Sequence, residues 1–196
     1  MDISGARNFK NVRALTLAAI LVALAVVGYG LLRIEPMPGV RVTFGFVFIT
    51  VIAYLFGPAM AFPAGVLANM LAFLVFPTGA AFNPLFDLNR GLAGILYGVC
   101  LYRRNHNSEY FIIWMVAAQA SVNFFCNIII NTYLLMLFGF IPVNALNVIT
   151  TVRIFRNVVF MPVEIIMLFI ILKFIAVYAQ KYNFIRPSKL IKKEGA

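Results

Sequence analysis

The chain has 196 residues, of which 63% are hydrophobic and 11% are charged, and its mean hydropathy is +0.97. Soluble globular domains contain about 45–50% apolar and about 25% charged residues, so this composition excludes a soluble enzyme, a disordered chain and a fibrous repeat. The net charge of +10 would suggest nucleic acid in a soluble domain, but Lys and Arg also collect in the cytoplasmic loops of membrane proteins. We therefore expect an integral membrane protein that lies in the lipid bilayer and has no nucleic-acid partner.

Six apolar segments follow one another along the chain. They show no strand alternation, so we interpret them as helices, which satisfy their backbone hydrogen bonds within lipid. The second and third segments form one run that the turn signal Gly57-Pro58 divides. The predicted fold is an all-α integral membrane protein, a single membrane domain over residues 1–196 with a bundle of six transmembrane helices and a basic tail at 180–196. The helices are expected at 14–32, 43–57, 58–76, 84–102, 110–138 and 155–179.

Lys and Arg residues are unevenly distributed among the connecting segments. If both termini are inside, the two ends and the 103–109 connection hold most of them. The outer side, with loops at 33–42, 77–83 and 139–154, then holds at most Arg33, Arg41, Arg153 and Arg156. This bias favours cytoplasmic termini.

Motifs that would indicate catalysis or a bound metal are missing from the sequence. There is no G-x-x-x-x-G-K-[ST] and no G-x-S-x-G, and the single histidine, His106, lies in a polar loop. Cys100 and Cys126 lie in apolar runs without metal-ligand spacing. Asp87 and Glu164 are the acidic residues well inside the apolar segments, so an intramembrane enzyme that uses one of them stays an alternative. We expect no enzyme activity, no metal and no cofactor.

Arg90 lies well inside the fourth apolar segment, where a charge is costly and is a functional candidate. One interpretation is that Arg90 pairs with Asp87, three residues earlier, and holds the bundle together. The other is that its guanidinium receives a carboxylate in a water-filled pocket.

Four amides recur every four residues in the fifth segment, at Gln119, Asn123, Asn127 and Asn131. On a helix this spacing gives one slowly drifting face. Such a stripe either bonds helices together or forms the wall of a polar pocket. Asn127 and Asn131 are expected in the outer half at the depth of Arg90, and this convergence favours a solute site that is open to the outside.

Two further features complete the candidate site and its surroundings. The loop 76–84 is rich in Gly and Pro and is expected either as a cap, with Phe82 and Asn83 over the pocket, or as an ordinary turn. In the first segment, Ala19-x-x-x-Ala23 is a small-xxx-small pattern that allows close helix approach, either within the bundle or to a partner.

Several short motifs along the chain form a set: Thr16–Leu24, Arg41–Phe46, Leu55-Phe56-Gly57-Pro58, Phe76-Pro77-Thr78-Gly79, Leu92–Gly98, and Arg153–Asn157 followed by Met161-Pro162. This set resembles the substrate-binding S components of energy-coupling factor (ECF) vitamin transporters, and most closely their folate-type branch. The resemblance extends from about residue 14 to residue 172.

The resemblance implies a multi-pass protein of a prokaryotic plasma membrane that captures a vitamin from outside. Its partners would be a transmembrane T component and two cytoplasmic ATPases, which would hydrolyse the ATP. In the family, an Ala-x-x-x-Ala motif in the first helix contacts the T component, and by position this motif is Ala19 and Ala23.

Departures from the folate-type pattern bear on the substrate. Folate-type members tend to carry an Arg where this chain has Gly30 and an Asp where it has Asn69, and the single Trp114 lies towards the inner side, away from a pterin. Arg90 and the Asn amides suit a smaller carboxylate with hydroxyl and amide groups, so pantothenate ranks first and folate is the alternative. A structural subunit is a further alternative. The candidate substrate-binding residues are Arg90, Asn127, Asn131, Asp87, Asn83, Phe82, Tyr97 and Asn123.

Overall fold

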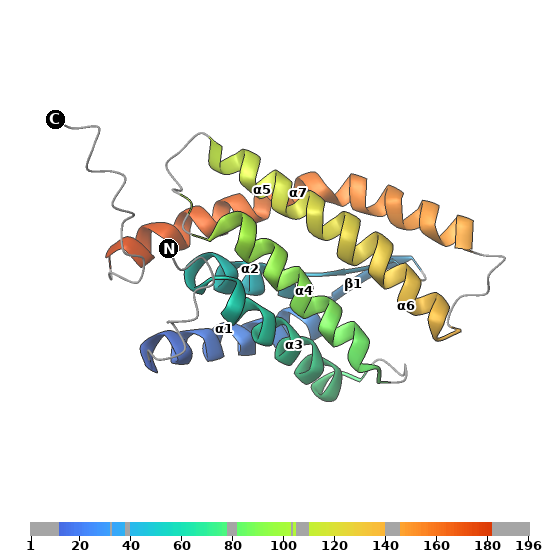
Figure 1. Ribbon diagram of the computed structural model, residues 1–196, viewed down its shortest axis with the longest axis horizontal. Helices are drawn as coiled ribbons and strands as arrows, with labels where there is room; N and C mark the ends of the chain where they lie inside the picture. The colour runs from blue at the N-terminus through green and yellow to red at the C-terminus, as the bar shows by residue number, and fades with distance from the viewer. Residues whose placement is uncertain are drawn as a thin grey trace.

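The computed structural model describes residues 12–31, 33–37, 40–77, 82–102, 104, 110–139 and 146–181. The helices in these ranges lie lengthwise in an elongated bundle (Figure 1). Because α5, η2 and α6 follow one another without a break, the helices make six rods, which fits the expected six-helix count. The elements are α1 (Val12–Gly30), α2 (Gly45–Phe56), α3 (Pro58–Val75), α4 (Pro84–Leu101), the rod of α5 (Tyr110–Ser121), η2 (Val122–Ile130) and α6 (Asn131–Leu137), and α7 (Leu146–Lys181).

The connection between α1 and α2 differs from the expectation of a plain loop. It forms an antiparallel hairpin of β1 (Arg33–Met37) and β2 (Val40–Thr43), with Arg33 opposite Thr43. Val40, Val42 and Thr43 are β-branched and favour a strand. The hairpin therefore adds two short strands to the connection expected at 33–42, outside the apolar spans.

The last helix also starts earlier than expected, at Leu146 rather than at residue 155. Arg153, which was expected in an outer loop, therefore lies about two turns inside α7, and Arg156 lies about three turns inside it. The placement of Arg153 in the outer loop 139–154 is therefore wrong, whereas Arg156 lies within a helix, as the expected span 155–179 has it. Arg153 is part-buried and donates a hydrogen bond to Thr132 of α6.

The first turn of α1 and the last turn of α7 lie at the same end of the bundle, and the β-hairpin lies towards the opposite end (Figure 1). α2 and α3 meet at Gly57, whose φ of 93° is in the left-handed region that glycine adopts readily. The break predicted at Gly57-Pro58 is therefore confirmed. Which end of the bundle faces the cytoplasm remains a prediction from the Lys and Arg distribution.

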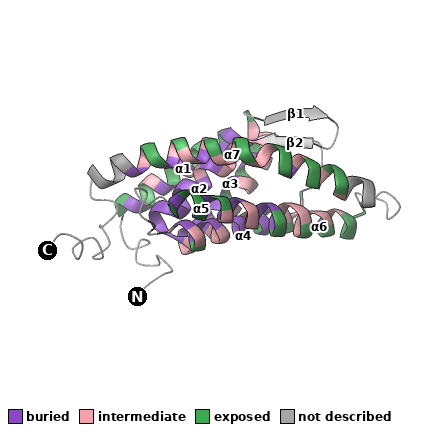
Figure 2. Ribbon diagram, turned by 90° about the horizontal axis from the view of Figure 1, so that it is seen from above, coloured by how far each residue is buried: buried purple, intermediate pink, exposed green. Residues whose placement is uncertain are grey.

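Four helical stretches are long and apolar enough to cross a membrane, namely Val12–Gly30, Pro58–Val75, Tyr110–Leu137 and Thr150–Ala176. Along α7, exposed residues alternate with less exposed ones (Figure 2), and apolar side chains such as Val163, Ile166 and Ile170 are exposed. These are the side chains that lipid would cover.

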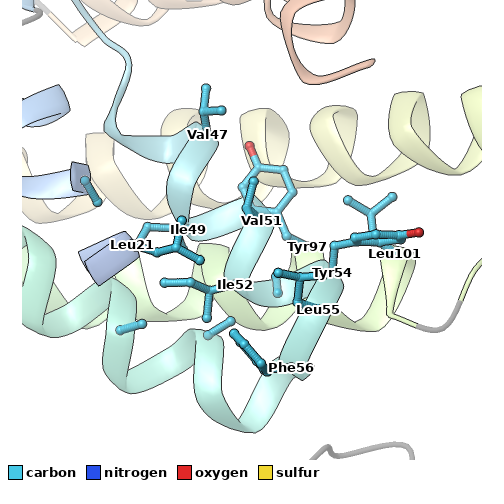
Figure 3. Packing of buried hydrophobic residues seen from close by; sticks show 14 of the residues in the cluster. Leu21, Val47, Ile49, Val51, Ile52, Tyr54, Leu55, Phe56, Tyr97 and Leu101 are labelled. Atoms are coloured by element: carbon cyan, nitrogen blue, oxygen red, sulfur yellow. The ribbon is translucent and has the colours of Figure 1, made fainter. Parts of the chain in front are cut away.

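α2 has only 12 residues, so it is about 18 Å long and shorter than a hydrocarbon core of about 30 Å. It is instead the most enclosed helix, with Val51, Ile52 and Ala53 at 0% exposure. Its side chains pack with Leu21 of α1 and with Tyr97 and Leu101 of α4 (Figure 3). A helix that is apolar on all sides is typical of such a buried position.

α3 and α4 pack so closely that glycine is required between them. A Cβ at Gly65 would lie 2.7 Å from the backbone oxygen of Arg90, and a Cβ at Gly94 would lie 2.5 Å from the backbone oxygen of Ala61. Because these positions carry no side chain, α3 and α4 approach closely, and the backbone at Arg90 packs directly against α3.

Candidate functional site

A hydrogen-bonded network lies between α4, the α5–η2 rod and α7. Glu164 of α7 accepts hydrogen bonds at Oε2 from Gln119 Nε2 at 2.6 Å and from Asn123 Nδ2 at 3.4 Å. Gln119 Oε1 accepts from the Tyr97 hydroxyl at 2.7 Å, and Asn123 Oδ1 accepts from Asn127 Nδ2 at 2.8 Å. The amide stripe therefore meets a carboxylate from another helix, and hydrogen bonding between helices accounts for part of it.

A second polar pair joins α3 to α4. Asn69 Nδ2 donates to Asp87 Oδ1 at 2.6 Å, and Asp87 is buried. The contact recorded for the Asp87 carboxylate is thus with Asn69 and not with Arg90. The Arg90 guanidinium lies over the Tyr29 ring of α1, with Cζ 5.6 Å from the ring centroid, which is within reach of a cation–π contact.

Three arginines are linked to Glu164 through electrostatic interactions that centre on Arg156. Arg156 of α7 interacts electrostatically with both Glu164 and Arg90, and Arg153 interacts with Arg156. Arg153 Nη1 donates to Thr132 Oγ1 of α6 at 3.5 Å, the long limit of a hydrogen bond. Arg156 Nε is buried and has no hydrogen-bond partner among the described residues. We call these arginines and the Glu164 network together the polar cluster: Arg90, Tyr97, Gln119, Asn123, Asn127, Arg153, Arg156 and Glu164.

The helix that carries the amides changes its geometry at the polar cluster. The segment Val122–Ile130 is a π-helix, a rare form that is frequently found at functional sites. The carbonyl oxygen of Cys126 accepts both the backbone N–H of Asn131 and the side chain of Asn89, the latter at 3.0 Å. Asn89, from α4, thus holds one carbonyl of η2, and its own Oδ1 is buried without a partner among the described residues.

Aromatic rings gather where α1 and α3 end and α4 begins. A Cβ at Gly30 would lie 2.0 Å from the Phe76 ring, so Gly30 leaves the space that this ring fills. The rings of Phe73 and Phe82 are 5.3 Å apart between centroids. These rings supply apolar surface at this end of the bundle, and the Tyr29 ring next to Gly30 lies under Arg90.

At the start of α4, the predicted site residue Asn83 has a structural role. Asn83 is the N-cap of α4, and its side chain accepts a hydrogen bond from Leu85 N at 3.0 Å, with Pro84 at the first helical position. The side chain therefore has a structural partner. Phe82, next to it, is 48% exposed, and whether it covers a substrate remains a prediction.

The predicted site residues are thus brought together only in part. Four of them, Arg90, Tyr97, Asn123 and Asn127, belong to the polar cluster. Asp87 is hydrogen-bonded to Asn69 of α3. Asn131 begins α6, and its backbone N–H makes the last hydrogen bond of the π-helix.

Sequence reasoning missed Arg153, Arg156, Asn69, Asn89 and Tyr29, and it considered Glu164 only as an enzymatic acid. One available signal was the spacing of Arg156 and Glu164, which are eight residues apart and so lie on one helix face.

Ala19 and Ala23 are exposed on α1, whereas Ala14, Ala18 and Ala25 of the same helix are buried. Packing within the bundle therefore uses another face, and docking through Ala19 and Ala23 stays a prediction. In the described part of the chain, no group of three or more His, Cys, Asp and Glu residues could hold a metal ion.

Comparison with known proteins gives consistent matches along most of the chain. Residues 13–177 match the model of the family described as ECF transporter, substrate-specific component. The folate transporter FolT of Clostridium novyi (strain NT) is 27% identical over 161 residues, which cover 82% of this chain and 88% of that protein. A crystal structure of FolT bound with folic acid is 25% identical, with a TM-score of 0.68, over 90% of this chain and 96% of that one. The chain therefore belongs to the family of ECF transporter substrate-specific components.

Proposed function

We propose that this protein captures a folate from outside the cell for ATP-driven import. The observation that carries this proposal is the similarity to FolT bound with folic acid, which extends over 96% of that chain. It reverses the order of the two substrates inferred from the sequence, because the relatives favour folate, the alternative, over pantothenate. The family is one of substrate-binding transporter subunits and not of enzymes, and no contact in the polar cluster favours catalysis.

Two departures from the folate-type pattern, at Asn69 and in the missing tryptophan, no longer favour pantothenate when the neighbouring side chains are considered. The carboxylate absent at Asn69 is supplied across the helix interface by Asp87, 2.6 Å from the Asn69 amide. The missing tryptophan is offset by the rings of Tyr29, Phe73 and Phe76 near the start of α4, because any of these rings offers a flat face to a heterocycle.

The chemistry of a folate suits a site with several kinds of group. Its pterin has both donors and acceptors of hydrogen bonds, which carboxylates and amides match, and its glutamate tail is anionic, which guanidinium groups match. We assign Arg90 to a substrate carboxylate, and Asn123, Asn127 and Tyr97 to the wall of the site. Asp87 and Asn131 remain candidates for the pterin end, whereas Phe82 and Asn83 would lie at the entrance.

Energy for import would come from partner subunits, since this chain has no phosphate-binding loop motif. We propose that a transmembrane T component docks on α1 at Ala19 and Ala23 and that two cytoplasmic ATPases drive the cycle. Both termini would then lie in the cytoplasm.

The test is to identify the small molecule that the protein retains. The protein is purified in mild detergent from cells grown with both folate and pantothenate, denatured, and the released compounds are measured by mass spectrometry. We expect a folate at close to one equivalent. Pantothenate at one equivalent would contradict the proposed substrate, and a protein without any retained or bindable vitamin would favour a structural subunit.

A further inference from the structure

Positive charge exceeds negative charge among the described side chains of the polar cluster. Arg90, Arg153 and Arg156 bring three guanidinium groups, whereas Glu164 is the one carboxylate of the cluster. Asp87 lies nearby on α4 and is hydrogen-bonded to Asn69. An excess of charge inside a membrane protein is costly unless a counter-charge is bound there.

The carboxylate of Glu164 is already engaged by uncharged groups. Its Oε2 accepts hydrogen bonds from the amides of Gln119 and Asn123, at 2.6 Å and 3.4 Å. Both hydrogen bonds come from amides, so neither of them uses a donor of the arginines. Arg156 therefore acts on Glu164 through its charge, and one of its own donors is unused.

That unused donor is the observation that points to a ligand. Arg156 Nε is buried and has no hydrogen-bond partner among the described residues. A buried donor that stays unpaired is costly, and more so when it is charged, so such groups normally have a partner. Arg156 lies on α7, and Arg90 of α4 is close enough to act on it electrostatically.

We propose that Arg156 and Arg90 form a two-arginine site for a dicarboxylate, in which one guanidinium from α7 and one from α4 bind the two carboxylates of the substrate's acidic tail. The proposal rests on the folate-binding function proposed above and assigns the glutamate end of the substrate to these two residues. The planar fork of a guanidinium matches a carboxylate with two parallel hydrogen bonds. A bound dianion would also join α4 to α7.

Three related probes separate charge from size. Folic acid has both tail carboxylates, folic acid dimethyl ester has the same skeleton with neither charge, and pteroic acid lacks the glutamate and keeps one carboxylate on its benzoyl ring. Calorimetric titration of the unaltered protein should show folic acid binding about 10- to 100-fold more tightly than the ester or pteroic acid, because charge-assisted hydrogen bonds are lost.

The variant Arg156→Gln should lower the affinity for folic acid to near that for the ester and leave the ester's own affinity within about threefold of the original. Arg156→Lys, which keeps the charge but loses the fork, should fall between them and covers the case in which the glutamine variant does not fold. Arg104→Gln is the matched control, because Arg104 lies over the Trp114 ring with Cζ 3.6 Å from its centroid, away from the polar cluster.

The outcomes distinguish the two proposals. If the unaltered protein binds folic acid and its dimethyl ester equally, or if Arg156→Gln binds folic acid as tightly as the unaltered protein, the two-arginine site is wrong while folate binding stands. If the unaltered protein binds none of the three probes, the proposed function itself is wrong.

Discussion

Arg90 combines a charge with a position well inside a membrane helix. Its guanidinium faces the Tyr29 ring, while the neighbouring Asp87 carboxylate is held by Asn69. A substrate carboxylate that binds Arg90 would need little reorganisation of the backbone, because α3 and α4 are in close contact at Gly65 and Arg90.

We therefore expect Arg90→Ala to weaken folate binding strongly. Truncating one partner of a desolvated charge pair typically costs about 2–5 kcal/mol, which is roughly a 30-fold to several-thousandfold loss of affinity. Calorimetric titration measures it, with Arg104→Ala as a control that should leave the affinity unchanged. An Arg90→Ala protein that is folded and binds folate as tightly as the parent would assign Arg90 a structural role.

The individual residues of the site were predictable where their signal is local. Arg90 stands out because a charge interrupts an apolar run, and the Asn123–Asn127 spacing follows from helical periodicity. The Asn83-Pro84 pair was also a local signal for a helix start, and it would have indicated that Asn83 is a cap. The Asn69–Asp87 bond could not be found in this way, because it joins two helices whose relative position is absent from the sequence pattern.

At the level of single elements, the π-helix η2 is the feature most closely tied to the site. Its carbonyl at Cys126 accepts the Asn89 side chain at 3.0 Å in addition to the Asn131 amide. The contact comes from α4, directly beside Arg90. We infer that Asn89 is a positioning residue, which keeps η2 in the register that sets Asn123 against Glu164 and Asn127 against Asn123.

Asn89→Ala should therefore loosen η2 and weaken folate binding by about 1 kcal/mol, the net contribution of one hydrogen bond. Hydrogen–deuterium exchange followed by mass spectrometry should show faster exchange in the peptide that covers Val122–Ile130. Ser121→Ala is a matched control, because the Ser121 hydroxyl bonds within its own helix to Ala117 O at 2.7 Å. Unchanged exchange in η2 with Asn89→Ala would show that the register does not depend on this contact.

The first helix has two distinct faces, one packed inside the bundle and one exposed at Ala19 and Ala23. Small side chains permit the close approach of another helix, so Ala23→Trp should abolish vitamin uptake and leave vitamin binding intact. Uptake in cells and calorimetry on purified protein measure the two effects. Ile113→Trp, at an exposed position of α5, should affect neither. Loss of binding in Ala23→Trp would instead identify the face as an internal packing surface.

For the whole molecule, the six helical rods were predictable because membrane helices have long apolar runs with clear breaks. The hairpin β1–β2 was not, because charged residues and prolines interrupt its sequence. The early start of α7 at Leu146 was not either, because Asn147, the Thr150-Thr151 pair and Arg153 interrupt the apolar run. The short α2 shows why length alone misleads: a helix of 12 residues is accommodated by burial inside the bundle rather than by contact with lipid.

The orientation in the membrane is open to a direct test. In a variant without Cys100 and Cys126, Pro77→Cys should react with a membrane-impermeant maleimide in intact cells, because the connection after α3 is expected outside. Arg104→Cys should react only after the cells are permeabilised, because the connection after α4 is expected inside. The opposite pattern would reverse the predicted topology.

The central claim is that this molecule is the folate-binding component of an importer. The most direct measurement is calorimetric titration of the purified protein, freed of retained ligand, with folic acid and with pantothenate. We expect folic acid to bind at one equivalent without turnover, and pantothenate neither to bind nor to compete with it. Stoichiometric binding of pantothenate together with no binding of folic acid would contradict the claim.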